Sequence, residues 1–418
     1  MSSWCRKAAQ ARTVIGSCSR IAIPSLAVVV GTLLVMTGAV SHKGAEAAEW
    51  SAEPSLSLRG VYNSNLILTA APHTETWGYW VSPGVKFAGA TENLEVSGRA
   101  AADFVSYYRG VDQSLTNLYF PLSAKYRTER ETFAFDGGFT RDNTLMGELQ
   151  QTGVVLRFTQ RNAWNVSPSW THDLTDRLSV QVGYQYSSAT YENGLQLGLV
   201  DYTVNNGSTG LSYRLTERDE MRVTALVTEF LAPDASDLRS SIYGGQLLWS
   251  RALTETISAV ISGGGRLVDS AIGTGSARVE DSQVVWVGNL TLQKSWEDAK
   301  LTLETSSDIY PSGFGLLVRT SRAGINLSKD LNERLTLSFD AAVLLAESVA
   351  SKATVTALPQ NRYINVTPAL RWKMAEWWTL DLNYTYSRRE VESFNETAFS
   401  NAATVMLTYF PPKLSVGR

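Results

Sequence analysis

Histidine is scarce in this sequence, and its scarcity limits the acid–base chemistry that can be expected. Only His73 and His172 follow residue 47. A Ser–His–acid site needs a histidine that reaches the nucleophile and is itself held by a third group. His73 stands beside Pro72 in an expected loop, and His172 adjoins Asp173 at an expected turn. We interpret both as solvated histidines and expect no enzyme, although a hydrolase using His73 with a distant serine remains an alternative.

Metal-binding side chains are equally few. The only cysteines, Cys5 and Cys18, both precede residue 48, so thiolate ligands and disulfides are not expected after that point. Asp234 and Asp237 lie close together in an expected loop and offer oxygen ligands to calcium. Two carboxylates in a solvated loop are more often without a metal, so we expect neither a metal nor another cofactor.

The charge balance argues against a nucleic-acid partner. The sequence has 37 Lys+Arg and 40 Asp+Glu, a formal net charge of −3. Removing residues 1–47 takes away five basic residues and one acidic residue, which brings the net charge to −7. No basic patch or run remains that would follow a phosphate backbone.

The N-terminal segment has the pattern of a secretory signal peptide. Basic residues from Arg6 to Arg20 precede a largely apolar stretch over 21–40, and Ala45-Glu46-Ala47 fits a small-residue cleavage site. We predict a signal peptide over 1–47, with an uncleaved membrane anchor as the alternative. No long apolar run follows, so no transmembrane helix is expected in the rest of the chain.

The remaining chain repeats one hairpin pattern. Between Leu335 and Val343 apolar and polar residues alternate, and a polar segment over 329–334 separates this run from the preceding one. Alternation with a period of two gives a strand one apolar face, and a tight polar turn between two such strands predicts a β-hairpin. Similar turns recur near 129, 175, 217, 254, 297 and 375. A hairpin repeated this often indicates an all-β protein.

The expected strands are long enough to cross a bilayer, which takes about 9–11 residues in a tilted strand. We predict a transmembrane antiparallel up-and-down β-barrel over 48–410, with about eighteen strands (16–20), and a short C-terminal tail over 411–418. Short turns alternate with longer polar loops, as in outer-membrane barrels. The expected strands are 54–66, 77–88, 93–107, 116–126, 131–141, 161–172, 178–190, 205–214, 221–230, 241–251, 256–266, 283–295, 299–310, 317–329, 334–346, 362–373, 377–389 and 398–410.

Aromatic residues gather at the ends of these strands. Amphipathic rings at the headgroup level form the two girdles of membrane barrels. An alternative is that some of them belong to an ordinary core. The aromatic residues concerned are Trp80, Tyr107, Tyr108, Tyr126, Trp170, Tyr213, Trp249, Trp296, Trp372, Trp377 and Trp378.

Alternation also sorts side chains between the two faces of the barrel wall. Apolar positions must face lipid, so the intervening polar positions are expected to face the lumen. An acid excess in this set predicts a modest preference for cations if the lumen is open, and Asp340 and Asp381 are expected to contribute to it. A lumen closed by side chains or loops is the alternative. The residues expected to line the lumen are Glu95, Arg99, Asp103, Asp136, Arg222, Arg266, Glu304, Asp308, Asp340, Asp381 and Arg389.

Two short motifs resemble those of a known family. The segment Val61–Leu66, with the following Ser82-Pro83-Gly84, resembles a family of bacterial outer-membrane β-barrel porins that is often associated with exosortase and exopolysaccharide systems. The chain's end, with alternating apolar residues before Phe410, resembles the signal read by the barrel-assembly machinery, although residues 411–418 extend past it. The resemblance implies an outer-membrane location and carries no catalytic residues.

From these observations we expect a porin-like channel or an exopolysaccharide-export conduit in the bacterial outer membrane. Its expected partners are outer-membrane lipid, the barrel-assembly machinery and either a polysaccharide or a small solute. A structural or adhesion barrel that works through its loops is an alternative, but the loops are moderate in length and hold no inserted domain.

Overall fold

The structure is a computed structural model that describes residues 49–110, 112–152, 158–273, 278–349, 361–391 and 396–417. The predicted signal peptide over 1–47 lies outside these residues. Ala47–Arg418 form one compact unit. Its long strands are β1 (Glu49–Asn63), β2 (Thr76–Ala90), β3 (Leu94–Tyr108), β4 (Gln113–Arg127), β5 (Glu131–Asn143), β6 (Gln160–Asp173), β7 (Leu178–Tyr191), β8 (Tyr202–Arg214), β9 (Asp219–Ala232), β10 (Leu238–Ala252), β11 (Ile257–Ile272), β12 (Val279–Ser295), β13 (Ala299–Pro311), β14 (Leu317–Asn332), β15 (Leu335–Ser348), β16 (Asn361–Ala375), β17 (Trp378–Val391) and β18 (Glu396–Tyr409).

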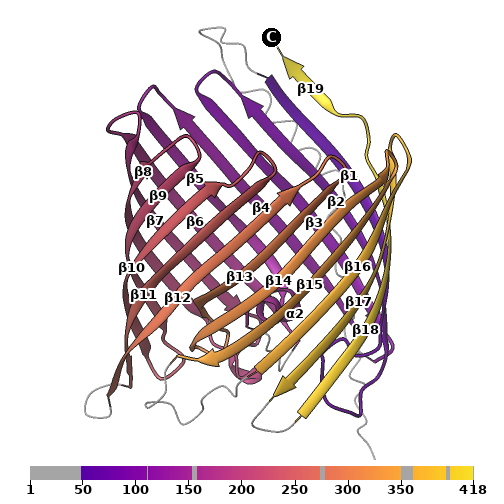
Figure 1. The fold of residues 1–418 in the computed structure, drawn as a ribbon. Coiled ribbons are helices and arrows are strands. Elements are labelled where there is room, and N and C mark those ends of the chain that lie inside the picture. The colour runs from indigo at the N-terminus through magenta and orange to yellow at the C-terminus, as the bar shows by residue number, and fades with distance from the viewer. Residues whose placement is uncertain are drawn as a thin grey trace, which may run out of the picture. The chain divides into compact units, whose positions relative to one another are not determined.

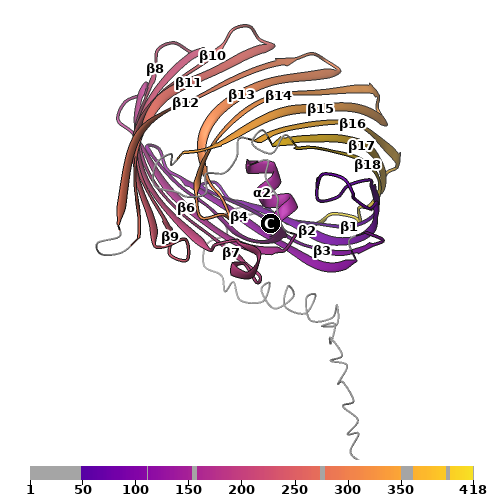
Figure 2. The ribbon, with the colours of Figure 1, turned by 90° about the horizontal axis from the view of Figure 1, so that it is seen from below.

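These strands form a closed barrel (Figures 1 and 2). Each strand pairs antiparallel with the next one in the chain, and β18 returns to β1, where Leu56 faces Tyr409 and Asn63 faces Ala402. Because the barrel is closed, each of the long strands is paired on both sides, as a sheet surrounded by hydrocarbon requires. The prediction of an eighteen-strand antiparallel up-and-down barrel is confirmed.

The C-terminal tail adds one further strand. Beyond Pro411 and Pro412 the chain forms β19 (Leu414–Gly417), which pairs antiparallel with Glu49–Ala52 at the start of β1. The segment expected as a simple tail therefore continues the closing seam past the end of β18, where β1 would otherwise lack a neighbour on that side.

The strands are joined by short turns at one end of the barrel and by longer connections at the other (Figure 1). In five of the short turns a threonine hydroxyl accepts a hydrogen bond from the backbone N–H three residues later. Thr175 accepts from Leu178 at 3.0 Å and Thr254 from Ile257 at 3.0 Å. Such side-chain bonds favour a turn over a continued strand, which explains why threonine recurs at this place in the hairpin pattern.

The connection between β5 and β6 departs from the expected all-β pattern. It contains the helix α2 (Thr144–Thr152), and a 3-10 turn (Leu195–Leu197) lies between β7 and β8. Viewed along the barrel, α2 lies inside the ring of strands (Figure 2). No helix in the described part of the chain has the length and apolarity to span a membrane.

The outer face of the barrel wall is apolar. Val182, Leu337 and Leu382 are 45%, 44% and 38% exposed although they are aliphatic. Such a surface is stable when hydrocarbon surrounds it, and this is the face that alternation assigned to lipid. Trp80 and Tyr107 are exceptions to the aromatic prediction, because both are buried and pack edge to face inside the barrel. Arg59, an inward residue of β1, lies 4.4 Å from the Trp80 ring centre and explains that orientation.

Candidate functional site

The lumen is the candidate functional site, and strand register determines which side chains reach it. Residues directly opposite each other in paired strands share a face. Asp340 faces Thr367, and Asp381 faces Arg371, all on the face opposite to the apolar exterior. The same reasoning places every residue of the predicted lumen set on the inner face. That they line a conducting path remains a prediction.

Several inward cations were missing from the predicted set and offset its acid excess. Arg371 forms an ion pair with Asp381 at 2.6 Å, and Arg322 forms one with Glu304 at 3.4 Å. Asp340 accepts a hydrogen bond from Asn326. Strict counting of alternate positions would have found both arginines. Because Asp381 and Glu304 are paired with arginines, the predicted modest cation preference does not follow from the acid excess alone.

Two predicted arginines are buried in the wall rather than open to the lumen. Arg266 is 5% exposed, and its guanidinium donates to Gln246 Oε1 at 2.8 Å and to the carbonyl of Gly245 at 3.2 Å. Arg389 is 7% exposed. By contrast, Arg222 is partly exposed and donates to Ser212 Oγ at 2.7 Å.

The helix α2 reaches across the lumen. It contacts β5 and β6, which flank it in sequence, and also β14 and β15. Those two pairs of strands are nine places apart in a ring of eighteen, so they form opposite walls. Leu145 and Leu149 of α2 pack with Leu68 of the β1–β2 connection and Tyr363 of β16. The helix therefore bridges the lumen instead of lying along one wall.

Glu148 ties α2 to β7 and to the connection between β13 and β14. Its carboxylate accepts hydrogen bonds from the Tyr191 hydroxyl and from the Gly313 backbone N–H, the latter at 3.1 Å. Glu148 is 2% exposed, and burial raises the pKa of its carboxyl group above the ordinary range. Because this carboxyl group is buried and bonded to two partners, its protonation state affects how firmly α2 is held.

A second charged group, the Arg161 guanidinium, lies beside α2 on the wall formed by β5 and β6. Arg161 of β6 donates to both carboxylate oxygens of Asp142, at 3.0 and 2.8 Å, and its Nη1 lies 3.9 Å from Glu148 Oε1. Gly147 makes room for this guanidinium, since a Cβ there would stand 2.2 Å from Arg161 Cζ. The Asp142–Arg161–Glu148 group therefore depends on a glycine in the helix.

Apolar residues also fill part of the lumen at the same end. Phe230 and Val268, which point inward from β9 and β11, are 0% and 1% exposed. They pack with Leu199 and Leu316 from two inward-folded connections. These connections are tied together by the Val200 N–H, which donates to the Gly313 carbonyl at 2.7 Å. Alternation assigned apolar side chains to lipid, but at this end some of them line a core inside the barrel.

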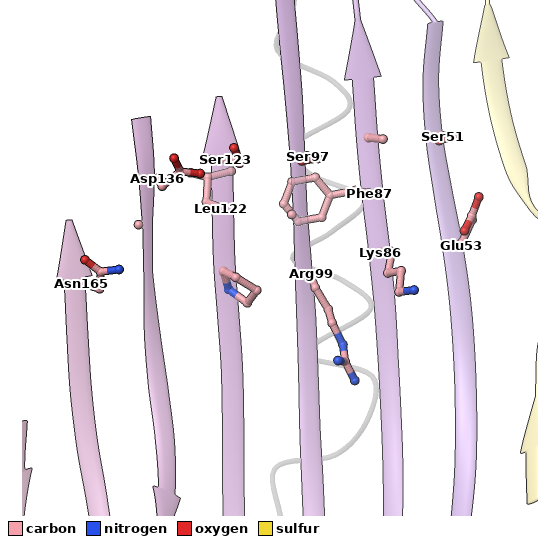
Figure 3. Close-up of a pocket in the computed structure, with 14 residues that line it drawn as sticks. Ser51, Glu53, Lys86, Phe87, Ser97, Arg99, Leu122, Ser123, Asp136 and Asn165 are labelled. Atoms are coloured by element: carbon pink, nitrogen blue, oxygen red, sulfur yellow. The ribbon is translucent and has the colours of Figure 1, made fainter. Parts of the chain in front are cut away.

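Towards the short-turn end the wall of β1–β6 is hollowed, and charged and polar side chains lie there among small and apolar residues. Figure 3 shows this wall, where a cavity of about 540 Å³ lies against inward side chains. Predicted lumen residues Arg99 and Asp136 both line it. Ser97, Ser123 and Asn165 contribute hydroxyl and amide groups. The described lumen thus combines a filled loop end with a hollow near the turns that carries charged and polar side chains.

Comparison with known proteins finds solved barrels of similar architecture. Acinetobacter baumannii OccAB3 is 12% identical with a TM-score of 0.43, covering 87% of this chain and 99% of that one. Pseudomonas aeruginosa OccK7 (OpdD) is 11% identical with a TM-score of 0.45, covering 88% and 99%. The alcaligin outer-membrane receptor FauA from Bordetella pertussis is 10% identical with a TM-score of 0.43, covering 85% and 76%. No family model and no curated protein matches the chain. Likenesses this distant say nothing about function, which must come from the side chains.

The two histidines form no nucleophile–base pair within the described residues. His172 Nδ1 lies 2.7 Å from Glu131 Oε1 on the outer face near the short turns, and its ring stacks on Trp170. His73 is exposed and packs edge to face on Phe399. In the same described residues no group of three histidine, cysteine or acidic side chains is arranged to hold a metal ion.

Proposed function

We propose that this protein is a porin-like channel of the bacterial outer membrane that lets small hydrophilic solutes diffuse through its lumen. The observation that carries the proposal is the contrast across one wall. The same strands present aliphatic side chains outside and ion pairs, serines and asparagines inside. A closed barrel with this polarity is suited to hydrocarbon outside and water inside. Outer-membrane lipid and the barrel-assembly machinery are its proposed partners.

The helix α2 sets the size of solute in this proposal. Because it crosses between opposite walls, it divides the lumen at the loop end. An exopolysaccharide-export role, which the family resemblance implies, would require α2 to leave the lumen. We therefore propose small solutes for the state described and treat polymer passage as an outcome of the test.

The test is a liposome-swelling assay with purified protein and neutral sugars of increasing size. We expect swelling with monosaccharides and none with long oligosaccharides. Swelling that is independent of sugar size would favour a polymer conduit with a displaced helix. No swelling with any sugar, from a protein whose gel migration changes on heating as a folded barrel's does, would contradict the channel and favour a structural barrel.

A further inference from the structure

The cavity on the β1–β6 wall contains two facing cations. Lys86 of β2 and Arg99 of β3 are directly opposite in the register and both point into the lumen. Figure 3 shows the two side chains extending from neighbouring strands. Side chains opposed in this way have Cβ atoms about 4.5–5.5 Å apart, and like charges there destabilise the sheet. Their pairing needs an explanation beyond folding.

Lys86 and Arg99 have no bonded anion among the described residues. In the described parts of the chain neither Lys86 nor Arg99 forms an ion pair or a side-chain hydrogen bond. Glu53 is opposite Lys86 in the register, but its Oε1 lies 3.3 Å from Lys413 Nζ. Asp136 lines the same cavity from β5, with β4 between it and Arg99. Arg371 and Arg322, two other inward arginines, each have a carboxylate partner, whereas Lys86 and Arg99 have none among the described residues.

The surrounding residues leave space for a ligand. In the adjacent rows of the wall the inward residues of β2 and β3 are Gly84 and Ala101 on one side and Ala88 and Ser97 on the other. These small side chains account for the hollow around the two cations. Beyond them, Ser123 and Asn165 offer a hydroxyl and an amide to the same cavity.

We propose that this cavity binds the carboxylate of an acidic sugar, a uronic acid or a residue of that kind. Arg99 and Lys86 would take the carboxylate, because guanidinium and ammonium groups both bind carboxylates and the guanidinium can do so in a bidentate manner. Ser97, Ser123 and Asn165 would donate to or accept from the sugar hydroxyls as each requires, whereas the Asp136 carboxylate would only accept from them. An inorganic anion would use only the cations, and a neutral sugar would leave them unpaired. The inference rests on the proposed channel, since it names the class of solute.

The decisive variant replaces both cations by neutral residues of similar shape, Lys86→Gln with Arg99→Gln. A matched control is Lys300→Gln with Lys373→Gln, which removes two inward charges from β13 and β16, outside the cavity lining. Heat-modifiable gel migration would show that both variants fold. The probes are sodium glucuronate and glucose.

The primary measurement is equilibrium binding by calorimetry on the detergent-purified protein, because it does not depend on conduction. We expect glucuronate to bind and glucose not to. The double substitution at 86 and 99 should weaken glucuronate binding by about tenfold or more, whereas the control should not. Binding should also weaken in 1 M salt, where the screening length falls to about 3 Å.

Current recordings across a planar bilayer provide the second measurement. Glucuronate should interrupt the current in a concentration-dependent way, and the double substitution should abolish those interruptions. Equal effects of glucose and glucuronate, or glucuronate binding that survives the double substitution, would overturn the inference. Glucuronate binding without any current would retain the site and contradict the channel, so the two failures are distinguishable.

Discussion

At the scale of single residues, Glu148 decides whether the lumen is divided. Its carboxylate is buried among Tyr191, Gly313 and Arg161, while Thr144 at the start of the same helix bonds to Thr159. Glu148, Asp142, Arg161 and Tyr191 come from four different elements. One substitution in this group should therefore affect the position of α2 more than the stability of the barrel.

The raised pKa of Glu148 gives the docking of α2 a pH dependence with a definite sign. A carboxyl group whose pKa is raised in the docked state holds its proton more tightly there. Docking is therefore fully favoured below the ordinary pKa of 4.5 and weakens as the pH rises through the raised value. Single-channel conductance should increase with pH in the native protein. The same dependence in Glu148→Gln, which cannot ionise, would show that another group is responsible.

Gly147 offers a steric test of the same group. In Gly147→Ala the new Cβ would meet the Arg161 guanidinium at 2.2 Å, and overpacking of this kind costs about 1–3 kcal/mol. We expect weaker docking of α2 and a larger conductance step at every pH. Gly207→Ala is the control, because nothing lies within 4 Å of its added Cβ. Equal conductance in the two variants would mean that Arg161 does not brace the helix.

At the scale of elements, the two faces of a strand should respond differently to charge. A lysine at Val182, Leu337 or Leu382 would enter hydrocarbon and cost about 2–4 kcal/mol near the midplane. A lysine at the adjacent inward positions Gln181, Ser338 or Asn383 would remain in water. Urea midpoints of refolded variants in lipid vesicles measure this difference. Similar losses at both sets would show that the register or the membrane assignment is wrong.

The strands could be predicted from sequence because the residues that define each hairpin are close together in the chain. Each hairpin carries its own alternation, and five of them carry a turn threonine, such as Thr175 bonded to Leu178 three residues away. The helix α2 could not be predicted in this way. Its anchor Glu148 bonds to Tyr191, 43 residues away, and to Gly313, 165 residues away. The inward turn of Trp80 has a similar origin in its contact with Arg59 of another strand.

Only part of the candidate site could be predicted from the sequence. Alternation identified the inward parity of Arg99 and Asp136, which line the cavity. It did not identify the facing of Lys86 and Arg99, because register across strands is not visible within one strand. Nor did it reveal that Asp381 is neutralised by Arg371.

At the scale of the whole molecule, the account requires a membrane location. Cell fractionation should recover a heat-modifiable protein with the outer membrane, and its N-terminus should begin near Ala48. The physical reason is that so much exterior aliphatic surface, including Leu337 at 44% exposure, would drive aggregation in water. Recovery as a soluble periplasmic protein would contradict both the signal peptide and the membrane barrel.

We propose that the lumen conducts and that α2 narrows it. Single-channel conductance of the native protein and of Glu148→Ala in a planar bilayer tests this most directly. Removing the carboxyl group takes away its hydrogen bonds to Tyr191 and to the Gly313 N–H, worth about 0.5–1.5 kcal/mol each, and leaves these buried partners unsatisfied, which favours undocking of the helix. We expect small uniform steps from the native protein and larger steps from Glu148→Ala. Folded, inserted proteins that give no current, or the same current from both, would contradict this proposal.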